Sequence, residues 1–165
     1  MRAILACLAA LGLLIASPNT PSANAATPDA APAVSGVYMA GGQPAALTEV
    51  TAHKDDPFGG QPVTALVFSV EPQGGDADAD SDAHNGKFGD AMVVRVQPDG
   101  RIVGVDMLHH GLVKTGGYIS AVGVLSLEDY RVAEGEISGH LTSGGAADAW
   151  GQQINVDLTF HTRTP

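Results

Sequence analysis

The feature that most constrains the fold is the alternation of apolar and polar residues in short segments. In the last such segment, "QQINVDLTFHT", Ile154, Val156, Leu158 and Phe160 alternate with polar residues. Successive side chains of a β-strand point to opposite faces, so this pattern predicts a strand with one buried face. We find no segment of helical length with apolar residues at i, i+3, i+4 and i+7. The sequence therefore predicts an antiparallel all-β protein.

Turn residues separate the predicted strands. Pro98-Asp99-Gly100 lies between two valine-rich runs and is the clearest hairpin signal, and Ala133-Glu134-Gly135 marks a second hairpin. The mostly apolar segment from Pro62 to Glu71 predicts a central strand. About eight strands with one apolar face each have to bury those faces against one another. We expect a single-domain antiparallel β-sandwich or flattened barrel over residues 34–165.

The N-terminal residues have the composition of an export signal. One arginine precedes an apolar run from Ala3 to Ala16, and a small-x-small triplet ends at Ala25. We expect residues 1–25 to be a signal peptide cleaved near Ala25, followed by a flexible leader over 26–33. The mature protein would then be periplasmic or secreted, without a membrane span and without Cys7, the only cysteine.

The composition limits the classes of partner. The chain carries 18 acidic and 8 basic residues, for a net charge of −10 with neutral histidines. Nucleic acids and anionic membranes favour lysine and arginine, so we expect neither as a partner. The charge is compatible with cations, with basic partner proteins, or with solubility alone.

The acidic segment 74–90 is the most concentrated candidate for a site. Aspartate occupies every second position, at Asp76, Asp78, Asp80 and Asp82. In an extended chain these carboxylates share one face and could converge on a divalent cation such as Ca²⁺. The segment lacks the glycine and the bidentate glutamate of an EF-hand-type loop. We favour a mobile acidic loop, with a Ca²⁺ site as the alternative.

The histidines do not have the spacing of a zinc or copper site. His109 and His110 are adjacent, so on a strand they would face opposite sides. His140 and His161 fall on the outward faces of predicted strands and could pair across a sheet. The sequence also lacks the Gly-x-Ser-x-Gly motif of serine hydrolases. An enzyme would have to draw on His109, His110, His140 or Asp106.

Two large aromatic residues, Phe58 and Trp150, lie beside predicted turns. Such side chains either close the edge of a core or contact a ligand. The sequence leaves both interpretations open.

Four stretches resemble an uncharacterised family of exported bacterial β-domains. They are "LTEVTAHKDDPFGGQPVTALVFS", "FGDAMVVRVQPDG", "GEISGHL" and "WGQQINVDLTF". In that family a strand ends in a basic-acidic-Asp-Pro-Phe corner, and the chain finishes on a strand with alternating apolar residues. The resemblance spans residues 34–162 and implies the fold and export, but no activity.

Three functions of different classes follow from these observations. The leading one is an exported, non-enzymatic binding or accessory protein that recognises another exported protein and needs no cofactor. The second is a divalent-cation domain that binds Ca²⁺ through the four aspartates of the acidic segment. The third is an enzyme with a histidine–carboxylate site. The sequence does not indicate the oligomeric state.

Overall fold

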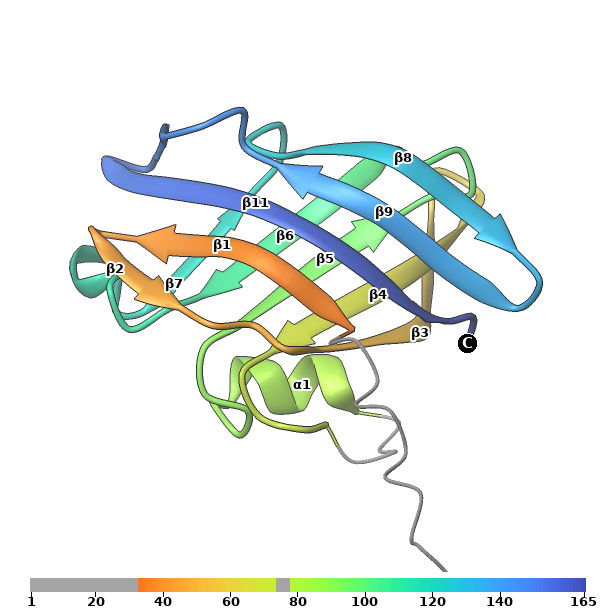
Figure 1. Cartoon of the computed structure of the whole chain (residues 1–165), viewed down its shortest axis with the longest axis horizontal. Helices are drawn as coiled ribbons and strands as arrows, with labels where there is room; N and C mark the ends of the chain where they lie inside the picture. Colours follow the sequence, from red (N-terminus) through yellow and green to blue (C-terminus); the bar gives the residue numbers. More distant parts are fainter. Residues whose placement is uncertain (1–32, 74–77) are drawn as a thin grey trace, which may run out of the picture. The chain divides into compact units, whose positions relative to one another are not determined.

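Eleven strands form two antiparallel sheets in the computed structural model, which describes residues 33–73 and 78–165. Sheet A has the order β2-β1-β11-β9-β8, with β10 paired to β11, and sheet B has the order β3-β4-β5-β6-β7. Figure 1 shows the strands of sheet A lying across those of sheet B. The predicted β-sandwich is confirmed, and the arrangement is not a closed barrel.

The residue bounds of the strands show where the predicted hairpins lie. Sheet A consists of β1 (Val34–Ala40), β2 (Gln43–Ala45), β8 (Ser126–Ala133), β9 (Glu136–Thr142), β10 (Ala147–Ala149) and β11 (Gln152–Arg163). Sheet B consists of β3 (Glu49–Phe58), β4 (Gln61–Ser69), β5 (Ala91–Val96), β6 (Ile102–Leu108) and β7 (Tyr118–Ala121). The hairpins expected at Pro98-Asp99-Gly100 and Ala133-Glu134-Gly135 are both confirmed, as β5–β6 and β8–β9.

Several hairpins of the described chain turn on two residues that both have positive φ, as type I′ turns require. Gly41–Gly42 and Gly59–Gly60 supply glycine at both positions. Trp150–Gly151, between β10 and β11, instead places a tryptophan at φ 56°. A left-handed conformation costs a bulky residue about 1–2 kcal/mol, so the β10–β11 turn holds its tryptophan at an energetic cost.

The main core lies between the two sheets. Along β11 the apolar residues predicted to face inward are all buried, and Phe160 packs edge-on against Phe68 of β4 with ring centroids 5.2 Å apart. Tyr38 of β1 is buried as well, and its hydroxyl donates to the carbonyl oxygens of Ala91 and Leu108 at 3.3 Å. Burial of each large apolar side chain stabilises the fold by about 1.5–3 kcal/mol.

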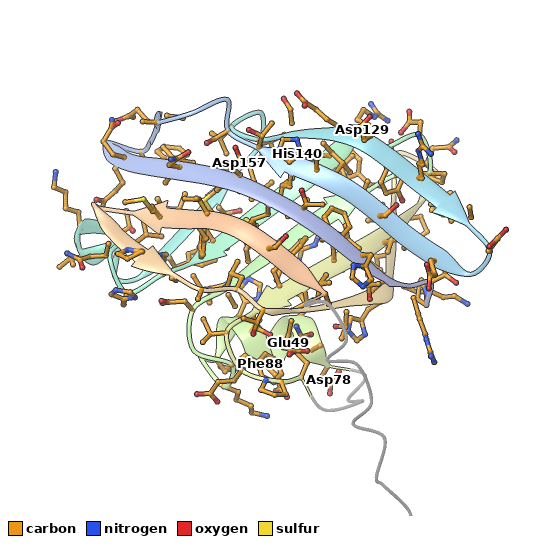
Figure 2. The ribbon with its side chains drawn as sticks, viewed as in Figure 1. Glu49, Asp78, Phe88, Asp129, His140 and Asp157 are labelled. Carbon is orange, nitrogen blue, oxygen red and sulfur yellow. The ribbon has the colours of Figure 1, made fainter. Side chains whose placement is uncertain are left out.

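A second apolar cluster lies on the outer face of sheet B. Val67 of β4 and Val93 of β5 are fully buried there, and Leu108 of β6 is buried beside them. The helix α1 (Ala79–His84) and the Phe88 ring cover them, with the small side chains of α1 against the sheet. Figure 1 shows α1 beside the strands of sheet B, and Figure 2 labels Phe88 next to it. The nearly continuous apolar sequences of β4 and β5 follow from this burial on both faces.

The acidic segment differs from the expectation, because residues 79–84 form a helix where we expected a loop. Val113–Thr115 form the short 3₁₀ helix η1. Within the described part of the chain, neither helix has the length and apolar character needed to cross a membrane. The predicted signal peptide, all but the last residue of the leader, and Asp76 lie outside the described residues.

Candidate functional site

The described aspartates of the acidic segment do not share one face. Asp78 occupies the N-cap position of α1 and is exposed, while Asp80 and Asp82 lie in the first turn. Residues two apart on a helix point in nearly opposite directions. Accordingly Asp80 pairs with Arg95 at 2.5 Å, and Asp82 pairs with Lys87 at 2.5 Å. The extended geometry that motivated a Ca²⁺ site is therefore wrong for these three residues, and Asp76 lies outside the described chain.

Arg95 of β5 is the centre of a charge network on the outer face of sheet B. Its guanidinium donates to Asp55 of β3 at 2.9 Å, to Asp80 of α1 at 2.5 Å, and to Asp106 of β6. Burial opposes the charge of Arg95, but the hydrogen bond to Asp106 and the three nearby carboxylates outweigh it and raise the pKa of Arg95. Three negative charges thus share one positive charge, and the network ties α1 to three strands.

Asp106 is the most buried carboxylate of this network. Burial alone would raise the pKa of Asp106, but hydrogen bonds from Ser120, Arg95 and Tyr118 outweigh burial and lower it. Tyr118 donates its hydroxyl to Asp106 at 2.9 Å. His84, in the last turn of α1, places Nε2 at 3.4 Å from Asp106 and its ring centroid at 5.6 Å from that of Tyr118. Asp106 is therefore an ionised carboxylate whose oxygens already accept several hydrogen bonds.

The end of β6 forms a second polar group. Asp90 accepts hydrogen bonds from the backbone N–H of His110 at 2.7 Å and from its Nδ1 at 2.5 Å. His109 and His110 stack with their ring centroids 4.6 Å apart, because the chain turns after Leu108. The expectation that these histidines face opposite sides of a strand is therefore wrong. Gly111 makes the turn possible, since a Cβ there would lie 2.0 Å from the carbonyl oxygen of Ala40.

Three potential metal ligands lie close together at this point. One side-chain atom each from Asp90, His109 and His110 lies within 4.8 Å of the other two, which is close enough for all three to contact one ion. The chemistry of His109 does not fit. Its side chain is 2% exposed, its Nδ1 accepts the Gly111 N–H at 2.9 Å, and Nε2 is buried without a hydrogen-bond partner. A neutral imidazole that accepts at one nitrogen carries its proton on the other, so no lone pair is left for a metal. Burial lowers the pKa of His109, which keeps it neutral.

Two hollows adjoin at Tyr118, and we define them together as the Tyr118 groove. One has a volume of about 340 Å³ and is lined by His84, Asp90 and His110 among others. The other has a volume of about 250 Å³ and is lined by Thr115, Tyr118, Ile119, Ser120 and Trp150. The Trp150 side chain is 74% exposed and its Nε1 donates to the Ser120 carbonyl at 3.1 Å. The Tyr118 groove is therefore a concave surface with polar side chains at one end and aromatic rings at the other.

The remaining candidates lie apart from the Tyr118 groove. His140 is on the outer face of sheet A, where Nε2 is 2.9 Å from Asp157 (Figure 2). It lies opposite Thr159 in the register, and His161 lies opposite Ser138, so the pairing that the sequence allowed between the two histidines does not form. Phe58 is exposed, as is Trp150, so neither closes the core. The four residues considered for an enzyme therefore do not form one site, because His140 belongs to the other sheet.

Sequence reasoning singled out Asp80 and Asp106 for other sites and missed Arg95 and Asp55, the other two members of the Arg95 network. Arg95 is the only charged residue of β5, and Asp106 is the only charged residue of β6. In the β5–β6 register Arg95 lies opposite Gly104, two residues from Asp106. Its stem passes over Gly104, where a Cβ would lie 3.3 Å from the Arg95 Cδ. Arg95 and Asp106 are single, opposite charges on the same face of a predicted hairpin, and this pattern could have indicated an ion pair between them.

No protein-family model matches the chain, and comparison with curated proteins and with solved structures finds no significant match. The resemblance to exported β-domains stays a prediction.

Proposed function

We propose that this protein is an exported, non-enzymatic binding domain whose ligand site is the Tyr118 groove. The observation that carries the proposal is the meeting of two hollows at one aromatic ring, beside an exposed tryptophan held on a left-handed backbone. Ligand sites are concave surfaces with aromatic walls and a few convergent polar groups. The N-terminal apolar run and the small-x-small triplet support export.

The state of the polar groups supports binding over catalysis. A general base needs a proton acceptor that is free to reach the substrate. Asp106 already accepts from Arg95 and Tyr118, and the accepting nitrogen of His109 is occupied by Gly111. These groups hold the walls of the groove in place, which is what a preformed binding site requires.

The test is a small-molecule fragment screen followed by NMR on the labelled full-length chain. We expect chemical-shift changes to concentrate at the amides of Tyr118, Ser120 and Trp150, with fewer at His110. Changes that gather instead around Ser138 and His140, which line a separate hollow on sheet A, would contradict the proposed site. Turnover of ester, glycoside or phosphate substrates that disappears in Asp106→Asn would contradict a non-enzymatic role.

The divalent-cation function has its own test. Since Asp80 and Asp82 already form ion pairs, Ca²⁺ would have to replace Arg95 and Lys87. Deleting the acidic segment would uncover the apolar face under α1, so the double variant Asp78→Asn, Asp82→Asn is the cleaner comparison. If millimolar Ca²⁺ raises the melting temperature of the unaltered protein but not of this variant, the acidic segment binds the ion.

A further inference from the structure

The two aromatic residues of the Tyr118 groove keep their polar hydrogens occupied. The Trp150 Nε1 donates to the Ser120 carbonyl at 3.1 Å, and the Tyr118 hydroxyl donates to Asp106 at 2.9 Å. Both side chains line the hollow of about 250 Å³. A ligand group in this hollow therefore meets aromatic rings whose N–H and O–H donors are already used within the protein.

The backbone conformation of Trp150 has an energetic cost that burial of its side chain does not offset. The residue adopts φ 56° in a turn that favours asparagine, aspartate or glycine, and its side chain stays 74% exposed. The turn is completed by Gly151, whose N–H donates to Asp148 at 3.1 Å. Strained residues with exposed side chains gather at ligand sites, where the strain holds a contact group in position.

The charges around the hollow are mainly negative. Asp106 accepts the Tyr118 hydroxyl, Asp148 accepts the Gly151 N–H, and Asp90 lines the adjoining hollow. Arg95 is shared by three carboxylates, and Lys114 of η1 is exposed next to Thr115. The whole chain has a net charge of −10. The hollow therefore attracts cations.

We propose that the hollow between Trp150 and Tyr118 receives the guanidinium or ammonium group of a basic segment in a partner protein. The inference rests on the binding function proposed above and adds the chemistry of the ligand. A cation over the face of tryptophan or tyrosine is attracted by the ring quadrupole, and a guanidinium also stacks on the ring. A second basic side chain of the same segment reaches the carboxylate of Asp90 in the adjoining hollow. A saccharide also stacks on aromatic rings, and the experiment below distinguishes it from a cation.

The test uses Trp150 itself, because it is the only tryptophan of the chain. The full-length protein is titrated with a capped tetra-arginine peptide while the tryptophan fluorescence is recorded. A capped tetra-citrulline peptide, which has the same shape without the charge, and maltotetraose serve as controls. We expect a saturable change with tetra-arginine alone, weaker at higher NaCl concentration because charges are screened. An equal response to tetra-citrulline, or a response to maltotetraose alone, overturns the proposal.

Variants separate the hollow from general attraction to an acidic protein. Tyr118→Phe and Tyr118→Leu both lose the hydrogen bond to Asp106, but only Tyr118→Leu loses the π face. We expect Tyr118→Leu to bind tetra-arginine about threefold more weakly than Tyr118→Phe, the value of one exposed cation–π contact. The Lys114 side chain is exposed, so Lys114→Gln should leave the fold unaltered. This variant should bind tetra-arginine more tightly because it lacks the cation next to the hollow. Salt-dependent binding that is the same in all of these variants overturns the proposal.

The two proposals fail in different ways. If the fragment screen maps to the Tyr118 groove while tetra-arginine leaves Trp150 unaffected, the cationic ligand is wrong and the binding site stands. If fragments and tetra-arginine both bind elsewhere, both proposals are wrong.

Discussion

The side chains that point away from the core differ between the two sheets. On β9 and β11 of sheet A they are polar and partly or fully open to solvent, as for His140, Asp157 and Thr159. On the central strands of sheet B they include Val67 and Val93, which are fully buried under α1 and Phe88. The alternating sequence of β11 therefore indicates a strand with one buried face, and the continuous apolar sequence of β4 indicates a strand with two buried faces. The difference shows that the acidic segment belongs to the fold as a cover of sheet B.

Charged residues follow the same division. The His140–Asp157 pair of sheet A is exposed, where such pairs contribute about 0–1 kcal/mol. The Arg95 network of sheet B is partly buried and connects α1 to β3, β5 and β6. Charges on sheet B should therefore matter more for stability than charges on sheet A.

The largest expected loss of stability comes from placing a charge on the outer face of sheet B, and the same change on sheet A is its control. Val93→Asp would bury an unpaired carboxylate under α1, and we expect it to lower the free energy of unfolding by more than about 3 kcal/mol. Ser138→Asp on sheet A, opposite Arg131, should change it by less than about 0.5 kcal/mol. Urea denaturation measures both. Equal effects would mean that α1 does not cover sheet B.

Removing the central cation of the Arg95 network should have the next largest effect. Arg95→Met leaves Asp55, Asp80 and Asp106 without their shared partner, and we expect a loss of about 2 kcal/mol after allowing for their partial exposure. The matched change on sheet A, Asp157→Asn, should cost no more than about 0.5 kcal/mol. A loss for Arg95→Met as small as that for Asp157→Asn would show that the network adds nothing to stability.

Packing under α1 is tested by a change of volume. Ala83 is fully buried against sheet B, so Ala83→Leu should destabilise by about 1–2 kcal/mol through overpacking. Ser81 of the same helix is exposed, and Ser81→Ala should leave the stability within about 0.5 kcal/mol. Thermal unfolding followed by circular dichroism distinguishes the two. A stabilised Ala83→Leu variant would mean that the helix has room above the sheet.

The smallest effect concerns pH. The Asp157 hydrogen bond raises the pKa of His140, and burial lowers the pKa of His109. His140 therefore adds stability that is complete below the unfolded pKa of about 6.5 and is lost as pH rises through its raised value. His109 adds stability above about pH 6.5 that is lost as pH falls toward its lowered value.

An NMR titration of the histidine ring carbons measures both groups. We expect His140 to take up its proton at higher pH than His109. The His140→Gln variant should differ most from the unaltered protein in its free energy of unfolding at pH 5 and least at pH 9. The opposite order of titration would contradict the burial of His109 against Tyr38.

Much of sheet A and the β5–β6 hairpin could be predicted from local sequence. The alternation in β11 gave the buried face of each residue, and Pro98-Asp99-Gly100 gave the turn. The helix α1 could not be predicted in the same way, because its sequence "ADSDAH" has no apolar stripe beyond two alanines. Its stability comes from packing against Val67 and Val93, which lie elsewhere in the chain.

The candidate site was less accessible to prediction than the fold. His109, His110 and Trp150 were singled out as candidates, but Tyr118 and Asp90 were not. The five residues come from the end of β6, from β7, and from two separate turns. Only the closure of the sandwich brings these segments together, so their spacing in the sequence carries no signature.

The sequence alone determined that the chain forms antiparallel β-structure, since period-two alternation and glycine turns act over a few residues. It also indicated that β4 is a central strand, and it left a sandwich and a flattened barrel as alternatives. Only the tertiary structure decided that the acidic segment covers sheet B as a helix, that its aspartates pair with Arg95 and Lys87, and that Trp150 meets Tyr118. These outcomes depend on contacts between residues distant in the chain, and the energies of such contacts are set by burial and geometry rather than by neighbouring residues.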